Sequence, residues 1–361
     1  MKRLLTIGVG MTLAASAWAT ATLDPDTNIL TFNVESGEET YSSAFTSSIA
    51  GIVKTGAGTI ILNTASTSFT GGKPITISGG AIEIQNANAL GSGNTVTVAN
   101  NATFRIVYAS GNGQANDIVL QGGSTLYLAG GGGNLDYFIG NVTLTGNATI
   151  NTQSRRGFGK TLNLGGYTLT RTGANVEFVF SGNGTAGTTA TVEGPGTICI
   201  ADKCTVTFMG SCTIDADVVF ENTAGDTVFN MWNRISPIPC TLKAIENTKF
   251  QMGSGLINNV GGTPLANIWN GNVEIASGKT LQFSGRSARA GDYLTIGGVI
   301  SGAGAVKIYD TNGAIIQFKG VNTYTGGTTV QSSLLRACVD GAIPTSSGIG
   351  ALVMNGGELQ L

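Results

Sequence analysis

The chain has 361 residues and a formal net charge of −2, from 19 basic and 21 acidic residues, so it lacks the excess positive charge that nucleic-acid-binding proteins use. Charged residues make up only 11% of the chain and apolar residues 41%, which excludes a solvated, disordered protein. Histidine is absent, and this excludes Ser-His-Asp catalysis and histidine-ligated zinc or haem.

The N-terminus has the parts of an export signal. Lys2 and Arg3 supply its positive charge and precede a stretch of uncharged, mainly apolar residues. Ala17 and Ala19 fit the small-x-small rule for cleavage, so we expect residues 1–19 to be a signal peptide that is cut after Ala19. An uncleaved membrane anchor is the alternative. We therefore expect the mature chain to be exported and to act at the outer membrane, at the cell surface or outside the cell.

A repeated pattern organises residues 51–361, after an N-terminal capping or entry segment at residues 20–50. Each copy has two apolar residues in alternation, then a turn of Gly, Asn or Ser, and usually a Thr followed by further alternating apolar residues. From Ile77 to Ile275 the copies are spaced by steps that average about 22 residues, a period typical of solenoid repeats. The second apolar residues of the copies are Ile77, Val98, Leu120, Leu144, Leu164, Phe208 and Ile275.

This pattern predicts an all-β protein. Alternation with a period of two indicates short strands, and the Gly and Asn residues between them suit sharp corners. A fixed repeat of about 22 residues is typical of a solenoid, here a single-stranded, right-handed parallel β-helix in which each repeat forms one coil. The alternative is an antiparallel β-sandwich array, which needs hairpins every 8–12 residues or so. The constancy of the repeat favours the β-helix.

The repeat also predicts which side chains stack between neighbouring coils. One inward-facing column contains Ile82, Phe104, Leu126, Ile150 and Leu169. The residues that follow them form an outward-facing column of Glu83, Arg105, Tyr127, Asn151 and Thr170. Since Glu83 and Arg105 are one coil apart, we expect them to form an exposed ion pair.

Two segments of the chain, residues 54–91 and 297–361, resemble each other. The first contains Phe69-Thr70-Gly71-Gly72, and the second contains the longer run Asn322-Thr323-Tyr324-Thr325-Gly326-Gly327-Thr328-Thr329-Val330. Both are similar to the autotransporter-associated β-strand repeat, also called the passenger-associated transport repeat. The resemblance implies the β-helical passenger of a large bacterial surface protein, in which the repeat is linked to efficient secretion. The repeat brings no catalytic residues with it.

The chain departs from an autotransporter in two respects. A complete autotransporter ends in a translocator barrel, whereas this chain ends at Leu361 inside a repeat, so we expect a missing C-terminal region to supply the outer-membrane translocator. Passengers also carry few cysteines, whereas this chain has five. The regular pattern is interrupted near residues 221–272, where we expect an irregular insertion.

Four of the five cysteines are close in sequence: Cys199, Cys204, Cys212 and Cys240. Their spacing matches no zinc site, so we expect no metal there. In an exported chain they could form one or two disulfides. Alternatively, they are buried as small apolar side chains, as the strand-like alternation around Cys199 suggests.

The acidic and basic residues give little support for catalysis. A carbohydrate-active β-helix enzyme, either a polysaccharide lyase or a glycoside hydrolase, would place several such groups on one outward face. The repeat places the close acidic pair, Asp215 and Asp217, in no demonstrable column with the local basic groups at Arg155-Arg156 and Arg286/Arg289. We therefore expect no catalytic activity and no cofactor, with such an enzyme as the alternative.

Two tryptophans, Trp232 and Trp269, lie in the interrupted region. On a loop that projects from the helix they could stack on sugars, whereas under a loop they would cover a local core. The sequence thus predicts a structural scaffold or adhesin, with host glycans or host surface proteins as partners, Trp232 and Trp269 as candidate ligand contacts, and no binding to nucleic acid.

Overall fold

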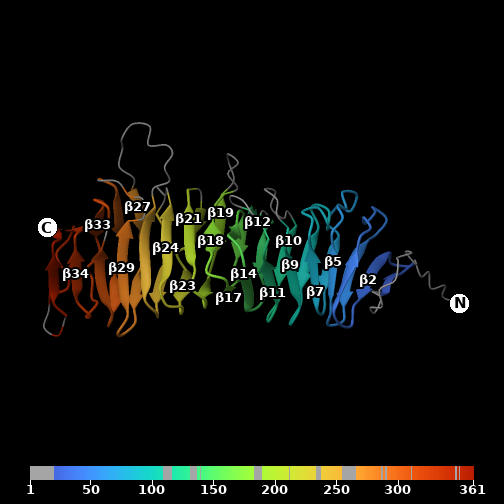
Figure 1. Ribbon diagram of the computed structural model, residues 1–361, viewed down its shortest axis with the longest axis horizontal. Helices are drawn as coiled ribbons and strands as arrows, with labels where there is room; N and C mark the ends of the chain where they lie inside the picture. Colours follow the sequence, from blue (N-terminus) through green and yellow to red (C-terminus); the bar gives the residue numbers. More distant parts are fainter. Residues whose placement is uncertain are drawn as a thin grey trace. The chain divides into compact units, whose positions relative to one another are not determined.

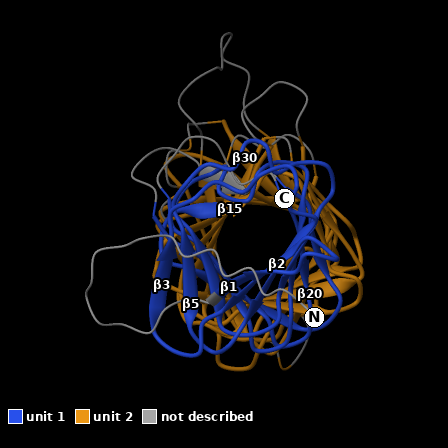
Figure 2. Cartoon of the chain, turned by 90° about the vertical axis from the view of Figure 1, so that its right-hand side faces the viewer, with its two compact units in different colours: residues 1–156 blue, residues 157–361 orange. Residues whose placement is uncertain are grey.

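The computed structural model contains strands β1 to β37 and no helix among the residues that it describes (Figure 1). Those residues are 20–108, 116–130, 136–138, 140–182, 189–210, 212–232, 237–253, 266–285, 288, 291–309, 311–345, 348 and 350–361. The predicted signal peptide lies outside them. The chain forms two compact units, unit 1 at residues 1–156 and unit 2 at residues 157–361 (Figure 2).

Unit 1 is a parallel β-helix with two sheets, and its coils each give one strand to either sheet. Sheet I contains, in order, β2 (Ile29–Asn33), β4 (Gly51–Thr55), β6 (Pro74–Ile77), β8 (Thr95–Val98), β10 (Asp117–Leu120) and β13 (Val142–Leu144). Sheet II contains β3 (Glu38–Tyr41), β5 (Thr59–Leu62), β7 (Ala81–Ile84), β9 (Thr103–Ile106), β11 (Thr125–Leu128) and β14 (Ala148–Thr152). The first strand, β1 (Thr20–Leu23), pairs with β2 in antiparallel fashion. A short strand, β12 (Asp136–Phe138), follows β11, and β15 (Arg156–Phe158) spans the boundary between the units.

Unit 2 is a parallel β-helix with four sheets. Sheet III contains β16 (Thr161–Asn163), β19 (Ala190–Glu193) and β22 (Cys212–Ile214). Sheet IV contains β17 (Thr168–Gly173), β20 (Gly196–Ile200), β23 (Val218–Asn222), β25 (Thr241–Ala244), β28 (Val273–Ile275) and β31 (Ile300–Gly302). Sheet V contains β18 (Glu177–Phe180), β21 (Thr205–Met209), β24 (Thr227–Trp232), β26 (Thr248–Gly253), β29 (Thr280–Gly285), β32 (Ala305–Tyr309), β34 (Thr328–Gln331) and β36 (Leu352–Asn355). Sheet VI contains β27 (Ala266–Trp269), β30 (Tyr293–Ile296), β33 (Ile315–Phe318), β35 (Leu334–Ala337) and β37 (Glu358–Gln360).

The prediction of an all-β parallel β-helix is confirmed. The chain forms about 13 coils of roughly 22 residues. In unit 1 Phe104 pairs with Leu126, one coil later. In unit 2 the steps between paired residues vary in length, and the step from Leu169 to Ile198 is longer than the step from Ile198 to Phe220. The paired strands stay in register, and the differences in coil length lie in the corners between the strands.

The extrapolation of the repeat beyond Leu164 is wrong in detail. Phe208 lies in β21 of sheet V and Ile275 lies in β28 of sheet IV, so the two residues belong to different columns. The range 221–272, predicted to be irregular, contains β24, β25, β26 and β27. Each of these strands forms a parallel pair, while residues 233–236 and 254–265 lie outside the described part of the chain.

The predicted inward-facing column forms the core of sheet II. Phe104 pairs with Ile82 on one side and Leu126 on the other, and Leu126 pairs with Ile150. All four side chains, and that of Leu169 in unit 2, are completely buried. Figure 2 shows the strands of unit 1 wound around this interior, which apolar side chains fill. Stacked coils thereby bury an apolar face that a single coil leaves open.

Corners of unit 2 require close approach between backbones of successive coils. Gly271, Gly298 and Gly320 stack at one such corner. A Cβ on Gly298 would meet the carbonyl oxygen of Gly271, and a Cβ on Gly320 would meet that of Gly298. The glycines are needed here for space rather than for a left-handed backbone.

We predict that Gly298→Ala destabilises unit 2 by about 2 kcal/mol, because the added methyl group must displace a neighbouring carbonyl. Gly225→Ala is the matched control, since a Cβ at Gly225 meets no atom within 4 Å. Chemical denaturation of the two variants checks this. Equal stability of both would contradict the stacked corner.

Candidate functional site

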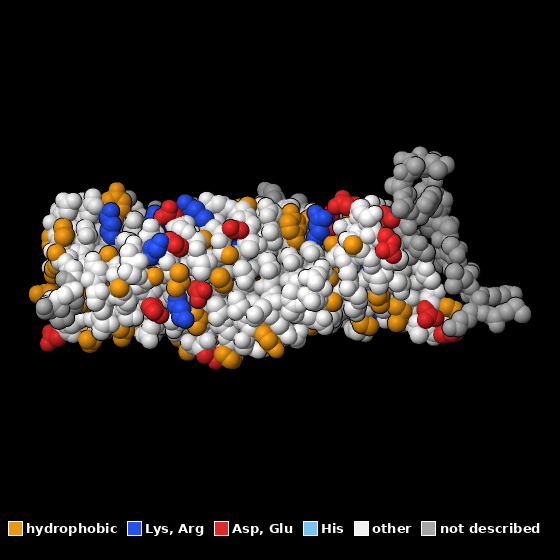
Figure 3. Space-filling view, turned by 90° about the horizontal axis from the view of Figure 1, so that it is seen from below, with side chains coloured by type: hydrophobic (Ala, Val, Ile, Leu, Met, Phe, Trp, Pro, Cys, Tyr) orange, Lys and Arg blue, Asp and Glu red, His pale blue; other side chains and the backbone are white. Residues whose placement is uncertain are grey.

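The outward faces of unit 1 are mostly uncharged. One column on sheet I runs through all six parallel strands and holds only β-branched side chains, each of them half-buried. Its members, in register, are Thr31, Val53, Thr76, Thr97, Val119 and Thr143. Figure 3 presents one face of the protein, on which charged side chains are scattered among uncharged ones. This column offers a regular packing surface but no side chain for acid–base chemistry.

Sheet II carries a charged exception to this pattern. Arg105 Nε lies 3.1 Å from Glu83 Oε2, and its Nη1 lies 3.2 Å from Glu38 Oε1. The guanidinium group also lies 5.2 Å from the centre of the Tyr127 ring. The predicted ion pair between Glu83 and Arg105 therefore forms, although the Glu83 side chain is only 8% exposed rather than open to solvent. Because its three charged groups are paired with one another across successive coils, we interpret this cluster as a contact between coils.

A polar cleft of about 230 Å³ lies on sheet V of unit 2, next to the corners that join sheets IV and V. Lys249 on β26, Gln282 on β29 and Lys307 on β32 lie in register and form one side of it. The other lining residues are Asp226, Asn247, Thr248 and Thr280, which lie in the corners or at the starts of strands. The cleft therefore runs across the strands, from one coil to the next.

The corner side of the cleft is held by hydrogen bonds between successive coils. The Asp226 backbone N–H donates to the Asn247 carbonyl at 2.9 Å, and the Thr280 N–H donates to Asn247 Oδ1 at 3.0 Å. Asp226 adopts a left-handed backbone, with φ at 57°. These contacts fix three consecutive corners relative to each other, so the cleft is preformed.

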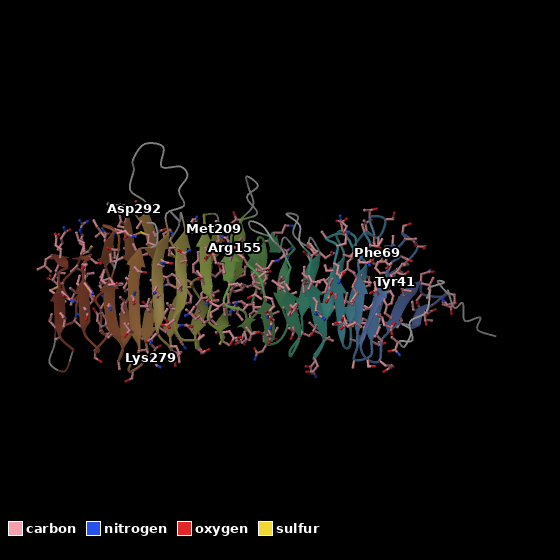
Figure 4. The ribbon with its side chains drawn as sticks, in the orientation of Figure 1. Tyr41, Phe69, Arg155, Met209, Lys279 and Asp292 are labelled. Carbon is pink, nitrogen blue, oxygen red and sulfur yellow. The ribbon has the colours of Figure 1, made fainter. Side chains whose placement is uncertain are left out.

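The lining of the cleft has more positive than negative side chains, with Lys249 and Lys307 against Asp226. Lys203 lies 3.9 Å from the Asp226 carboxylate, and Lys279, labelled in Figure 4, lies 2.7 Å from Glu246. Lys249 and Lys307 have no carboxylate within salt-bridge distance among the described residues. Lys307 Nζ instead lies 4.9 Å from the ring centre of the exposed Tyr309. Two of the lysines on this surface thus remain available to an anion.

Trp269 is not a ligand contact. Its side chain is completely buried, with its ring centre 5.0 Å from that of Phe250 and 6.0 Å from that of Phe208. The hypothesis of an exposed aromatic residue is wrong for Trp269 because β27 turns this residue inward. Trp232 is half-buried at the end of β24, and its ring lies over Gly253, where a Cβ would meet it. Trp232 keeps a partly accessible face on sheet V.

The cysteines form no disulfide in the structure, which records all five as thiols. Cys204, Cys212 and Cys240 are buried, and Cys199 is half-buried beside Thr223. Burial raises the pKa of the Cys204 thiol to about 11 even though Arg171 opposes the shift, and burial also raises the pKa of Cys199. Neutral thiols in these positions pack as small apolar groups and are poor metal ligands.

The acidic pair lies in a corner. Asp215 and Asp217 follow β22, and Asp215 Oδ2 accepts a hydrogen bond from the Gly194 N–H at 3.1 Å. Arg156 is buried, where its Nη2 donates to the Tyr108 carbonyl at 2.6 Å. The other basic pair, Arg286/Arg289, lies outside the described residues. Asp215 and Arg156 thus both form hydrogen bonds with backbone groups of other coils.

The run at residues 322–330 has a structural role. Asn322 is buried, its Oδ1 accepts the Ile300 N–H at 2.7 Å and its Nδ2 donates to the Ala342 carbonyl at 2.6 Å, so it links three coils. Tyr324 is completely buried and its hydroxyl lies 2.6 Å from Thr328 Oγ1. Phe69, labelled in Figure 4, occupies the matching place in the sequence of residues 54–91 and is also buried. It packs edge-to-face on Phe45, with ring centres 5.6 Å apart.

Comparison with known proteins gives no identification. No family model matches the chain, and neither the curated proteins nor the solved structures contain a match. Within the described residues, no group of three or more Cys, Asp or Glu side chains is placed to hold a metal ion. The same part of the chain has no helix long and apolar enough to cross a bilayer.

Burial raises the pKa of Tyr324 from its ordinary value of 10.0 to about 12. The neutral phenol is favoured in the folded state, so it adds to the free energy of unfolding. This added stability is fully present below pH 10 and is lost as the pH rises towards 12. We predict that wild type loses roughly 2–3 kcal/mol more stability than Tyr324→Phe over this interval. Urea unfolding at several alkaline pH values checks this.

Tyr309→Phe is the control for that comparison, because it removes an exposed hydroxyl. It should follow the alkaline stability profile of wild type. Identical profiles for Tyr324→Phe and wild type would contradict the burial of a neutral phenol at residue 324.

Proposed function

We propose that this chain is an exported bacterial cell-surface protein, an autotransporter-like passenger whose β-helix works as a scaffold or adhesin without catalysis. The observation that supports this most is the continuous in-register outer face, of which the six-residue column on sheet I is the clearest example. A solenoid of this kind presents long surfaces on which partners can bind. Host glycans and host surface proteins are the partners we propose.

Two sequence features add to the proposal. The signal-like segment at residues 1–19 favours export, and the run at residues 322–330 resembles the passenger-associated repeat. In the structure Phe69 and Tyr324 are both completely buried, and each precedes a strand, β6 and β34 respectively. The translocator that would deliver the passenger to the surface is proposed to belong to a C-terminal region.

The alternative is a carbohydrate-active β-helix enzyme. One observation favours the enzyme: Asp226 and two lysines line the polar cleft on sheet V. A fold shared with such enzymes does not by itself confer their activity. Cleavage of an oligosaccharide that depends on Asp226 would support this alternative over a pure scaffold.

We predict that the intact chain, expressed in a Gram-negative host, leaves the cytoplasm and begins with Thr20 after processing. A chain that lacks residues 2–19 should stay in the cytoplasm, because the targeting segment is gone. Cell fractionation followed by mass spectrometry of the N-terminus checks both. Intact chain retained in the cytoplasm would contradict export, and export without cleavage would support the membrane-anchor alternative.

A further inference from the structure

We propose that the cleft on sheet V is a binding site for an acidic glycan, with Lys249 and Lys307 as its two anion-binding groups. This inference rests on the proposed adhesin function and deepens it by naming a ligand class. It starts from the in-register column Lys249, Gln282 and Lys307, which three successive coils contribute.

The spacing of the two lysines sets the length of the ligand. Neighbouring strands are about 4.8 Å apart, so residues two coils apart in one column are separated by roughly 10 Å. Gln282 lies between Lys249 and Lys307 and has no side-chain hydrogen bond in the described structure. A ligand that satisfies all three groups is therefore extended and runs across the strands, with an anionic group near each lysine and polar groups between them.

The lining favours a sugar over other anionic ligands. Asn247, Thr248, Thr280 and Gln282 provide amide and hydroxyl groups, which match the hydroxyl groups of a carbohydrate. Tyr309 is 39% exposed beside Lys307 and offers an aromatic surface at one end of the column. A glycan in which every second sugar is a uronic acid repeats its carboxylate over a length similar to two coils.

A peptide ligand fits this surface less well. Strand β29 pairs with β26 on one side and with β32 on the other, so the cleft has no free strand edge for an added strand. Its lining residues are all polar, so it offers no apolar pocket for a side chain. The cleft volume of about 230 Å³ is also small and suits a short stretch of a longer chain that continues over the sheet.

The net charge of the protein makes the site selective. The whole chain carries −2, so a polyanion is not attracted to the protein as a whole and must find a local positive region. Asp226 adds a negative group to the cleft, but Lys203 lies 3.9 Å from it. Binding should therefore depend on Lys249 and Lys307 and should weaken as salt is added.

The test is a calorimetric titration, at low salt, of the purified protein with a hyaluronan octasaccharide, in which uronic acids alternate with neutral sugars. Wild type should bind, and the double variant Lys249→Gln/Lys307→Gln should bind at least about tenfold more weakly. Lys243→Gln is the matched control, because it removes the same charge from an outward position on sheet IV, between Glu221 and Glu274 in register. Its affinity should be unchanged.

Two further ligands define the class. A neutral chitin octasaccharide should not bind, and poly-glutamate should bind more weakly than hyaluronan. No binding by wild type, undiminished binding by the double variant, an equal loss in Lys243→Gln, or equal binding of either further ligand would each overturn the proposal. The replaced lysines are partly exposed in wild type, so the variants should fold. Thermal unfolding of each variant checks this.

Failure of this site can be told apart from failure of the proposed function. The double variant should be exported as wild type is, because neither lysine lies in residues 1–19. Normal export with no hyaluronan binding would overturn the glycan site alone. Retention of wild type in the cytoplasm would overturn the proposed function and leave the binding measurement intact.

Discussion

In-register stacking of apolar side chains between neighbouring coils determines the rest of this structure. In unit 2 the ring centres of Phe229 and Phe250 are 6.0 Å apart, and those of Phe250 and Phe283 are 5.7 Å apart. A shift of one residue in any strand would turn its inward side chains to the outside. Since burying an aromatic side chain contributes about 2–3 kcal/mol, such a shift is strongly disfavoured.

The same register fixes the outer surface without any separate interaction. Once Phe250 and Phe283 are held inside, Lys249 and Gln282 must lie side by side outside, although they are a whole coil apart along the chain. The corners are not bound to one length by this register and vary in length, as loops on a surface can. The cleft on sheet V is thus a consequence of core packing combined with corners that bring Asp226 and Asn247 next to the column.

The sequence was sufficient to predict the fold and the register where corners are short. The column through Phe104 and Leu126 and the ion pair of Arg105 both follow from the constant length of the repeat in unit 1. The sequence was insufficient where corners lengthen, because a repeat then no longer tells which sheet a strand joins. Phe208 was assigned to the wrong column for this reason, and the column of Lys249 and Lys307 was not found.

A second limit concerns polar residues that point inward. Lys54 lies on the same inward face of β4 as Ile52 and is completely buried. Its Nζ donates to the carbonyls of Gly56 at 3.0 Å and Gly79 at 3.3 Å. Arg171 is likewise buried near the end of β17, where Nη1 donates to the Asp202 carbonyl at 2.9 Å. Such a side chain points inward and donates hydrogen bonds to the backbone carbonyls of a corner. A pattern of apolar and polar residues does not distinguish it from a side chain that faces solvent.

The most direct test of the stacked coils is a distance across unit 1. Spin labels at Thr31→Cys and Thr143→Cys, with Cys199 and Cys338 replaced by Ser, report a separation that pulsed electron paramagnetic resonance measures. The two residues lie in one column, five coil steps apart, which predicts a single distance centred near about 24 Å. A distance that is much longer, or a broad distribution without a maximum there, would contradict the parallel β-helix.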